Sequence, residues 1–192
     1  MTPIELLKQR RTVRKFAQDP IPAELLTELT ELARLAPSGA NKQPIRYLII
    51  DRPDLVGQVH PLVAWAGYTR PQGVPAENEL PVAYIMLLGD TTVKANCAQD
   101  EGITGEAMIC GAALMGLGAC WLGAIQRKPL AELFALPAEY EVLSMIALGY
   151  PAQQPVQEDD ADNIKYYFDE QGTLHVPKLP AEKVTFRNSL PK

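Results

Sequence analysis

The sequence predicts an α+β or α/β fold formed by one domain over residues 1–192. Segments with helical spacing of apolar residues alternate with short, continuous apolar runs of strand length. The composition is 47% hydrophobic and 21% charged, which is close to the average for a globular protein. A chain of 192 residues is also long enough to bury a full core without disulfides or a structural metal.

The helices are predicted from leucine spacing and from start signals. Thr2, Pro3 and Glu5 form a capping-box pattern, with proline at a position that helices accept. Pro61 interrupts the third helical segment. The predicted helices are 2–11, 23–35, 53–67, 98–117 and 130–134.

The strands are predicted from apolar runs bounded by glycine, proline and polar residues. The run at 82–88 is continuous and is expected to be a central strand. Residues 169–172 read as a hairpin turn, whereas 67–81 have no period and predict a mobile loop. The stretch from Pro177 onward is expected to be extended. The predicted strands are 45–51, 82–88, 120–125, 142–148, 164–168 and 173–176.

Charge and cysteine content limit the partners and the compartment. A net charge of −5 and a pI near 5.1 argue against broad nucleic-acid or anionic-membrane binding. Cys97, Cys110 and Cys120 form no CxxC pair, and with only His60 and His175 available we expect no metal site. We interpret the three cysteines as small buried hydrophobes and the histidines as structural or exposed. The odd cysteine count and the absence of a signal pattern favour the cytoplasm.

The uncharged run at 107–125 reaches the lower length limit of a membrane span. Four glycines, including Gly116 and Gly118, interrupt it. A buried helix that turns near these glycines into a buried strand explains the pattern better than a membrane helix does.

Four clusters could carry chemistry. The cluster at 10–14 holds three guanidinium groups, which suit phosphate or a planar anion, although such a cluster is more often a solvated turn. The loop at 37–44 contains a hydroxyl, a glycine and amides, and its simpler interpretation is an ordinary connection. The glycine-rich turn at 116–123 exposes backbone N–H groups against which a flat ring could lie. Residues 186–189 hold one arginine in the C-terminal tail.

Together these clusters resemble the nitroreductase-like FMN flavoproteins, a family related to the iodotyrosine deiodinases and to the flavin-cleaving enzyme of vitamin B12 lower-ligand synthesis. The matching segments are RRTVRKF at 10–16, APSGANKQP at 36–44, GLGACWLGA at 116–124, LHVPK at 174–178 and an arginine near the C-terminus. They follow the family order over the whole chain. The resemblance implies an α+β nitroreductase-like fold with a central, mostly antiparallel sheet flanked by helices, in an intertwined homodimer.

The resemblance also implies how FMN is held. Arg10, Thr12 and Arg187 would face the phosphate and ribityl chain, with Arg11 contributing through backbone or side chain. Arg14 would approach N1 and O2 of the flavin, where a fixed cation stabilises the reduced state. The remaining cofactor-binding residues would be Leu122 and Gly123 near N5 and O4, and Pro37, Ser38, Gly39 and Asn41 from the partner subunit.

The function implied is an FMN-dependent oxidoreductase that passes a hydride from NAD(P)H through flavin N5 to a nitroaromatic, a quinone or a similar conjugated acceptor, in a ping-pong order. No side chain is assigned a catalytic role. Trp65, Tyr68 and Arg70 are candidate substrate contacts in the segment 65–79, and plain packing of the two aromatics is the alternative. Two other functions stay open: reductive dehalogenation or flavin modification by the same fold, and a non-catalytic FMN sensor or storage protein.

Overall fold

The computed structural model describes residues 1–190 and contains a main sheet, a small C-terminal sheet and helices on both faces of the main sheet. The helices are α1 Pro3–Gln9, α2 Ala23–Leu35, α3 Pro53–Val59, α4 Ala98–Leu114, α5 Arg127–Leu133 and α6 Ala181–Val184. The strands are β1 Ile45–Ile50, β2 Ala83–Asp90, β3 Gly118–Leu122, β4 Tyr140–Gly149, β5 Val156–Asp159, β6 Tyr167–Phe168 and β7 Leu174–Lys178. Short 3-10 turns occupy Gly39–Asn41, His60–Leu62 and Glu77–Glu79.

The main sheet has the strand order β1-β2-β4-β3, and every neighbouring pair is antiparallel. All of β2 is buried because both faces of the sheet are covered. Its odd-numbered residue Ile85 packs in the cluster formed by α2 and α4, while Met86 packs in the cluster formed by α3 and α5. This alternation explains why the sequence shows a continuous apolar run there.

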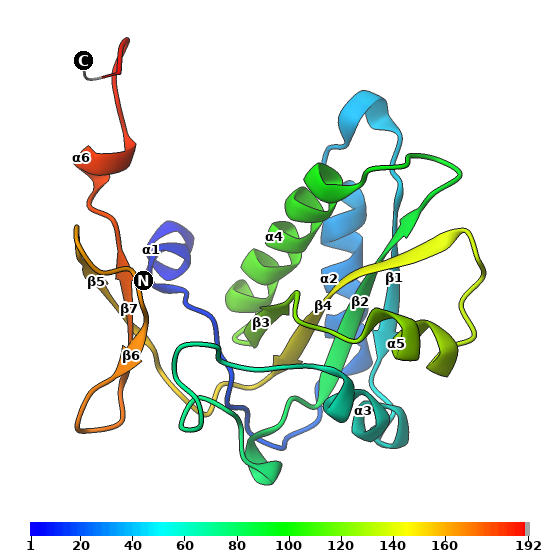
Figure 1. Cartoon of the computed structure of the whole chain (residues 1–192), viewed down its shortest axis with the longest axis horizontal. Coiled ribbons are helices and arrows are strands. Elements are labelled where there is room, and N and C mark those ends of the chain that lie inside the picture. The colour runs from blue at the N-terminus through cyan, green and yellow to red at the C-terminus, as the bar shows by residue number, and fades with distance from the viewer. Residues whose placement is uncertain (191–192) are drawn as a thin grey trace.

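The C-terminal sheet has the order β5-β7-β6, with β5 parallel and β6 antiparallel to β7. It is set apart from the main sheet, and α6 lies beyond it (Figure 1). The predicted hairpin is confirmed, and Gly172 takes a φ of 81° in its turn. Strand β5 was not predicted, because a four-residue polar segment whose partner is distant in the sequence has no local signal.

Several predicted boundaries change. The segment 53–67 stops being an α-helix at Val59 and continues as a 3-10 turn containing Pro61. The prediction that the chain is extended from Pro177 is wrong over Ala181–Val184, which form α6. The capping box is confirmed: Thr2 N donates to Glu5 Oε2 at 2.6 Å, and Glu5 N donates to Thr2 Oγ1 at 3.3 Å.

The uncharged run at 107–125 is divided between the end of α4 and β3, with Gly116 at a φ of 76° in the turn that joins them. Across residues 1–190, no helix has the length and apolar character needed to cross a membrane.

The expected burial holds for Cys97 and Cys120 but is wrong for Cys110, which is partly exposed on α4 and donates to Glu106 at 3.3 Å. His60 is half-buried against the hydroxyl of Tyr84, 2.8 Å from its Nδ1, which confirms a structural position.

Candidate flavin site

The segment 10–16 runs between α1 and α2 in extended form and is held by two core residues. Val13 N donates to Ala119 O of β3 at 3.0 Å, and the buried Phe16 forms a bridge with Pro151 after β4. Gly118 and Gly149 make room for these side chains: a Cβ on Gly118 would lie 2.8 Å from Val13 Cγ1, and one on Gly149 would lie 2.8 Å from Phe16 Cβ. The apolar residues of the segment therefore fix the backbone that carries its arginines.

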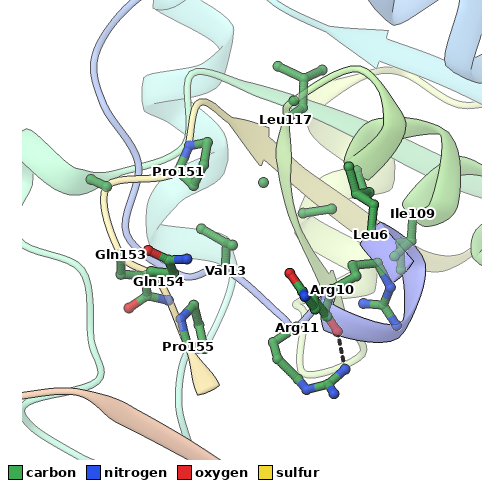
Figure 2. A pocket seen from close by; sticks show the side chains of 16 residues that line it. Leu6, Arg10, Arg11, Val13, Ile109, Leu117, Pro151, Gln153, Gln154 and Pro155 are labelled. Atoms are coloured by element: carbon green, nitrogen blue, oxygen red, sulfur yellow. Dashed lines mark hydrogen bonds between the residues drawn. The ribbon is translucent and has the colours of Figure 1, made fainter. Parts of the chain in front are cut away.

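Arg10 and Arg11 line a cavity of about 620 Å³, which we call the Arg10 cavity. The end of α4, the glycine-rich turn at 116–119 and residues 151–155 complete its wall. Figure 2 shows Arg10 and Arg11 on one side of this cavity and Gln153 and Gln154 on the other. The cavity thus combines two guanidinium groups, amide side chains and exposed backbone of a glycine-rich turn.

Two buried donors at the Arg10 cavity have no hydrogen-bond partner among residues 1–190: Arg11 Nε and Gln153 Nε2. The other nitrogens of Arg11 are engaged, since Nη2 donates to Lys8 O at 2.9 Å and to Gln157 Oε1 at 2.8 Å, and Nη1 donates to Arg10 O. Unpaired buried donors are costly, so they favour a ligand that brings acceptor oxygens. A phosphate with a polyhydroxylated chain fits this donor set.

The charges at this cavity are only partly balanced. Arg10 Nη2 lies 3.6 Å from Glu106 Oε1 on α4, longer than a good hydrogen bond. Burial, followed by the nearby charge of Arg10, lowers the pKa of Arg11 below its ordinary value. The second cause reflects two cations held close together, and an anionic ligand would relieve their repulsion.

A second cavity of about 220 Å³, the Gly123 cavity, brings together five of the predicted site residues: Arg14, Trp65, Arg70, Leu122 and Gly123. A Cβ added to Gly123 would meet no atom within 4 Å, so the backbone there faces open space. Arg70 Nε donates to Trp65 O at 2.9 Å. This cavity offers the glycine-exposed wall that was predicted for a flavin ring, with the guanidinium groups of Arg14 and Arg70 in its lining.

The two aromatic residues of the predicted substrate loop differ in exposure. Trp65 lines the Gly123 cavity but is only 6% exposed and belongs to the core cluster on the α3 and α5 face. Tyr68 is 61% exposed and packs against Tyr166, with ring centroids 5.1 Å apart. For Trp65 the geometry favours the packing alternative, and Tyr68 is the side chain open to a substrate.

Cys120 lies at the floor of the Gly123 cavity and is 2% exposed. Burial raises the pKa of its thiol to about 11, against a smaller opposing effect of the Arg14 charge. The thiol is therefore protonated near neutral pH and is not an activated nucleophile.

The loop with Pro37, Ser38, Gly39 and Asn41 follows α2 and belongs to neither cavity. Gly39 N donates to Asp100 Oδ1 at 3.2 Å, near the start of α4, whereas Ala113, near the end of α4, lines the Arg10 cavity. At 1.5 Å per helical residue, these two ends of α4 are on the order of 20 Å apart. Arg10 itself contacts Glu106 in the middle of α4. The loop at 37–41 and the Arg10 cavity therefore lie against different stretches of this helix.

Arg187 is also separate from Arg10 within one chain. It is exposed and lies beyond α6, in the C-terminal segment that extends away from the main sheet (Figure 1). Thr12 is half-buried between the two cavities, in the same extended segment as Arg10 and Arg14.

Sequence reasoning missed Gln153, Gln154 and Tyr166. The glutamines reach the Arg10 cavity only because Ala152 N pairs with Lys15 O at 2.9 Å, a contact with no local sequence signal. Tyr166 places its ring 4.7 Å from Cζ of Arg14, and only its position just before a predicted strand end could have drawn attention to it.

The chain belongs to the nitroreductase family, whose model matches residues 7–75 and 92–150. This confirms the resemblance, the fold and the oxidoreductase class. A protein of Methanothermobacter thermautotrophicus that carries the name "Putative NADH dehydrogenase/NAD(P)H nitroreductase" is 28% identical over 175 residues, covering 85% of this chain and 86% of that protein.

Two further relatives extend the comparison. An iodotyrosine deiodinase of Thermotoga neapolitana is 44% identical over 55 residues, covering 29% of this chain and 30% of that protein. The solved structure of an FMN-dependent nitroreductase of Clostridium difficile R20291 covers 97% of this chain and 99% of its own, at 20% identity and a TM-score of 0.68. At that identity the likeness concerns the fold.

Proposed function

We propose that this protein is an FMN-dependent oxidoreductase that uses NAD(P)H to reduce a small conjugated acceptor, such as a quinone or a nitroaromatic, in a ping-pong order. The observation that carries the proposal is the continuous segment 10–14, which lines the Arg10 cavity at one end and the Gly123 cavity at the other. An extended chain spans at most about 13–14 Å over these four steps, which suits a ligand with a phosphate and a ring at opposite ends. The FMN-dependent nitroreductase with the same fold supports the choice of this ligand.

In this assignment, Arg10 and Arg11 bind the phosphate, and Gln153 donates its unpaired amide hydrogen to an oxygen of the ligand. Arg14 holds a positive charge at the ring edge, and the backbone around Gly123 lies along the ring. The flavin supplies two-electron transfer when bound. The chain's own contribution is binding, orientation and a fixed cation, and no side chain is required as an acid or base.

The proposal includes a homodimer with two equivalent flavin sites at its interface. Ser38 and Asn41 line neither the Arg10 cavity nor the Gly123 cavity of their own chain, so we assign them to the flavin of the other subunit. Arg187 follows the same logic, because its segment extends away from its own main sheet (Figure 1).

A second activity on the same site is reductive dehalogenation, and the similarity to an iodotyrosine deiodinase over 55 residues favours testing it. Tyr68 is exposed and follows Gly67, which lines the Gly123 cavity, so its ring could stack on a phenol or a quinone alike.

The experiment has two parts. Purified protein should show the visible absorption of flavin, and denaturation should release FMN rather than FAD; a colourless protein that takes up no added FMN would contradict the proposal. Initial rates with NADH and with NADPH are then measured against a quinone, a nitrofuran and iodotyrosine. Parallel double-reciprocal plots with the quinone or the nitrofuran support the reductase, and iodide release with no quinone or nitrofuran turnover supports the dehalogenase.

A further inference from the structure

We propose that Tyr166 is a positioning residue for Arg14 and thereby sets how strongly the protein favours reduced over oxidised flavin. The inference rests on the proposed function, since it concerns the cation assigned to the flavin ring edge. The inference is carried by the contacts that Arg14 and Tyr68 make with Tyr166. Both tyrosines lie outside the family motifs.

The guanidinium of Arg14 lies over the aromatic face of Tyr166, with Cζ 4.7 Å from the ring centroid. This is within the range at which a cation is attracted to an aromatic ring. Among residues 1–190, no carboxylate lies within 4.0 Å of Arg14 and no hydrogen bond orients its side chain. The ring of Tyr166 is therefore what fixes the plane of this guanidinium.

Tyr166 is itself held from its other side. Its ring packs at 57° against Tyr68, with centroids 5.1 Å apart, and its side chain is half-buried. Arg14, Tyr166 and Tyr68 thus form a stack that joins the ring-edge cation to the C-terminal sheet and to the segment 65–79.

The position of Arg14 matters because a cation stabilises charge only where it is held. A free arginine side chain samples many rotamers and remains hydrated, whereas one packed on an aromatic face is preorganised and partly shielded from water. The aromatic face does not neutralise the charge. Loss of the ring should therefore weaken the effect of Arg14 on the reduced state without removing the cation.

Tyr167 provides a matched control in the next position. Its ring stacks on His175, with ring centroids 4.9 Å apart and an interplanar angle of 13°, whereas Arg14 lies over the ring of Tyr166. Replacing Tyr167 perturbs the same C-terminal sheet and leaves the stack on Arg14 intact.

The experiment measures the flavin midpoint potential, together with the Kd of oxidised FMN, in Tyr166→Leu, Tyr166→Phe, Tyr167→Leu, Arg14→Gln and the double variant Arg14→Gln/Tyr166→Leu. Tyr166→Leu should lower the potential, corresponding to an about 2- to 30-fold loss in preference for reduced flavin, the range of a cation–aromatic contact. Tyr166→Phe should restore the wild-type value, because it keeps the ring. Tyr167→Leu should also keep that value. In the double variant, the shift should equal that of Arg14→Gln alone, because Tyr166 acts through Arg14.

An unchanged potential in FMN-bound Tyr166→Leu overturns the inference, and so do equal shifts in Tyr166→Leu and Tyr167→Leu or additive shifts in the double variant. If Tyr166→Leu does not fold, Tyr166→Met removes the ring with a flexible side chain of similar length and carries the same expectations. Protein that binds no FMN in any form would contradict the proposed function instead. In that case, a double-mutant cycle of thermal unfolding for Arg14 and Tyr166 still reports the contact, and its lack of coupling overturns the stack itself.

Discussion

A methyl group added at Gly118 should lower stability, whereas one added at Gly123 should spare stability and weaken flavin binding. In Gly118→Ala, the new Cβ would lie 2.8 Å from Cγ1 and 2.9 Å from Cβ of Val13. Val13 is a stiff, β-branched residue that is 7% exposed and is tied to β3 by its backbone N–H. Either the valine or the segment 10–16 must move.

The magnitude follows from two opposing effects. Overpacking costs about 1–3 kcal/mol, and replacing glycine with alanine returns about 0.4–1 kcal/mol through the unfolded chain. The net loss is about 0.5–2 kcal/mol, which lowers Tm by about 1–8 °C for a chain of this size. Gly123→Ala meets nothing within 4 Å, so its Tm should stay the same or rise slightly.

The effect on flavin binding is expected from Gly123→Ala. The methyl of Gly123→Ala occupies the Gly123 cavity and should weaken FMN binding about 5- to 150-fold, from the same range of overpacking costs. The assay is thermal unfolding of flavin-free protein together with fluorescence titration of FMN. A wild-type Tm in Gly118→Ala would refute the packing argument, and wild-type FMN affinity in Gly123→Ala would refute the placement of the ring.

Three further predictions concern the phosphate end, the unpaired amide and the C-terminal sheet. Arg10→Ala should weaken FMN by about 1.5–3 kcal/mol and riboflavin far less, measured by flavin titration, whereas Arg34→Ala, a surface control whose charge pairs with Glu31, should change neither ligand. Gln153→Leu should stabilise the flavin-free protein, which loses an unpaired donor, and should weaken FMN about 2- to 12-fold, because the bound state loses a hydrogen bond. Equal effects in Gln154→Leu would point to the cavity wall in general. The pKa of His175 is raised from 6.5 by hydrogen bonds to Asp169 and then Glu158. The contribution of His175 to folding stability is therefore complete below its unfolded pKa and is lost as pH rises through the raised pKa of the folded state. The Tm difference between wild type and His175→Asn should shrink from about pH 5.5 to pH 8. A Tm difference that widens over this range would contradict the assignment.

Most elements of the main sheet could be predicted from local signals. Strand β2 is an unbroken apolar run, because helices cover both of its faces. Thr2 and Glu5 predict the start of α1, because the reciprocal hydrogen bonds between them are local. Predicted boundaries differ from the structure by a few residues, as at the end of α4. There the helix ends at Leu114, before Gly116 takes a left-handed conformation.

The candidate site was only partly predictable, because its parts meet through contacts that are distant in the sequence. The family motifs identified Arg10 and Arg14, and the two cavities contain them. Gln153 enters the first cavity through pairing of the chain after β4 with the segment 10–16, and no local pattern reports that pairing. Trp65 shows the opposite error, in which the sequence suggests a site residue that is part of the core. Its place in an irregular segment made it a candidate substrate contact, but its side chain is buried.

The position of the loop at 37–41 gives the proposed dimer a physical basis. Along α4, this loop lies near Asp100 and the Arg10 cavity lies near Ala113. In a twofold dimer, a contact from one subunit to its partner is repeated in reverse, so antiparallel approach of two α4 helices would place each loop near the other subunit's cavity. In this proposed assembly, the loop would complete the partner's site although it lines neither cavity of its own chain. It follows that FMN affinity and dimer stability should be linked, and that dilution below the dimer Kd should release flavin. Sedimentation that shows a monomer with full flavin occupancy would contradict this linkage.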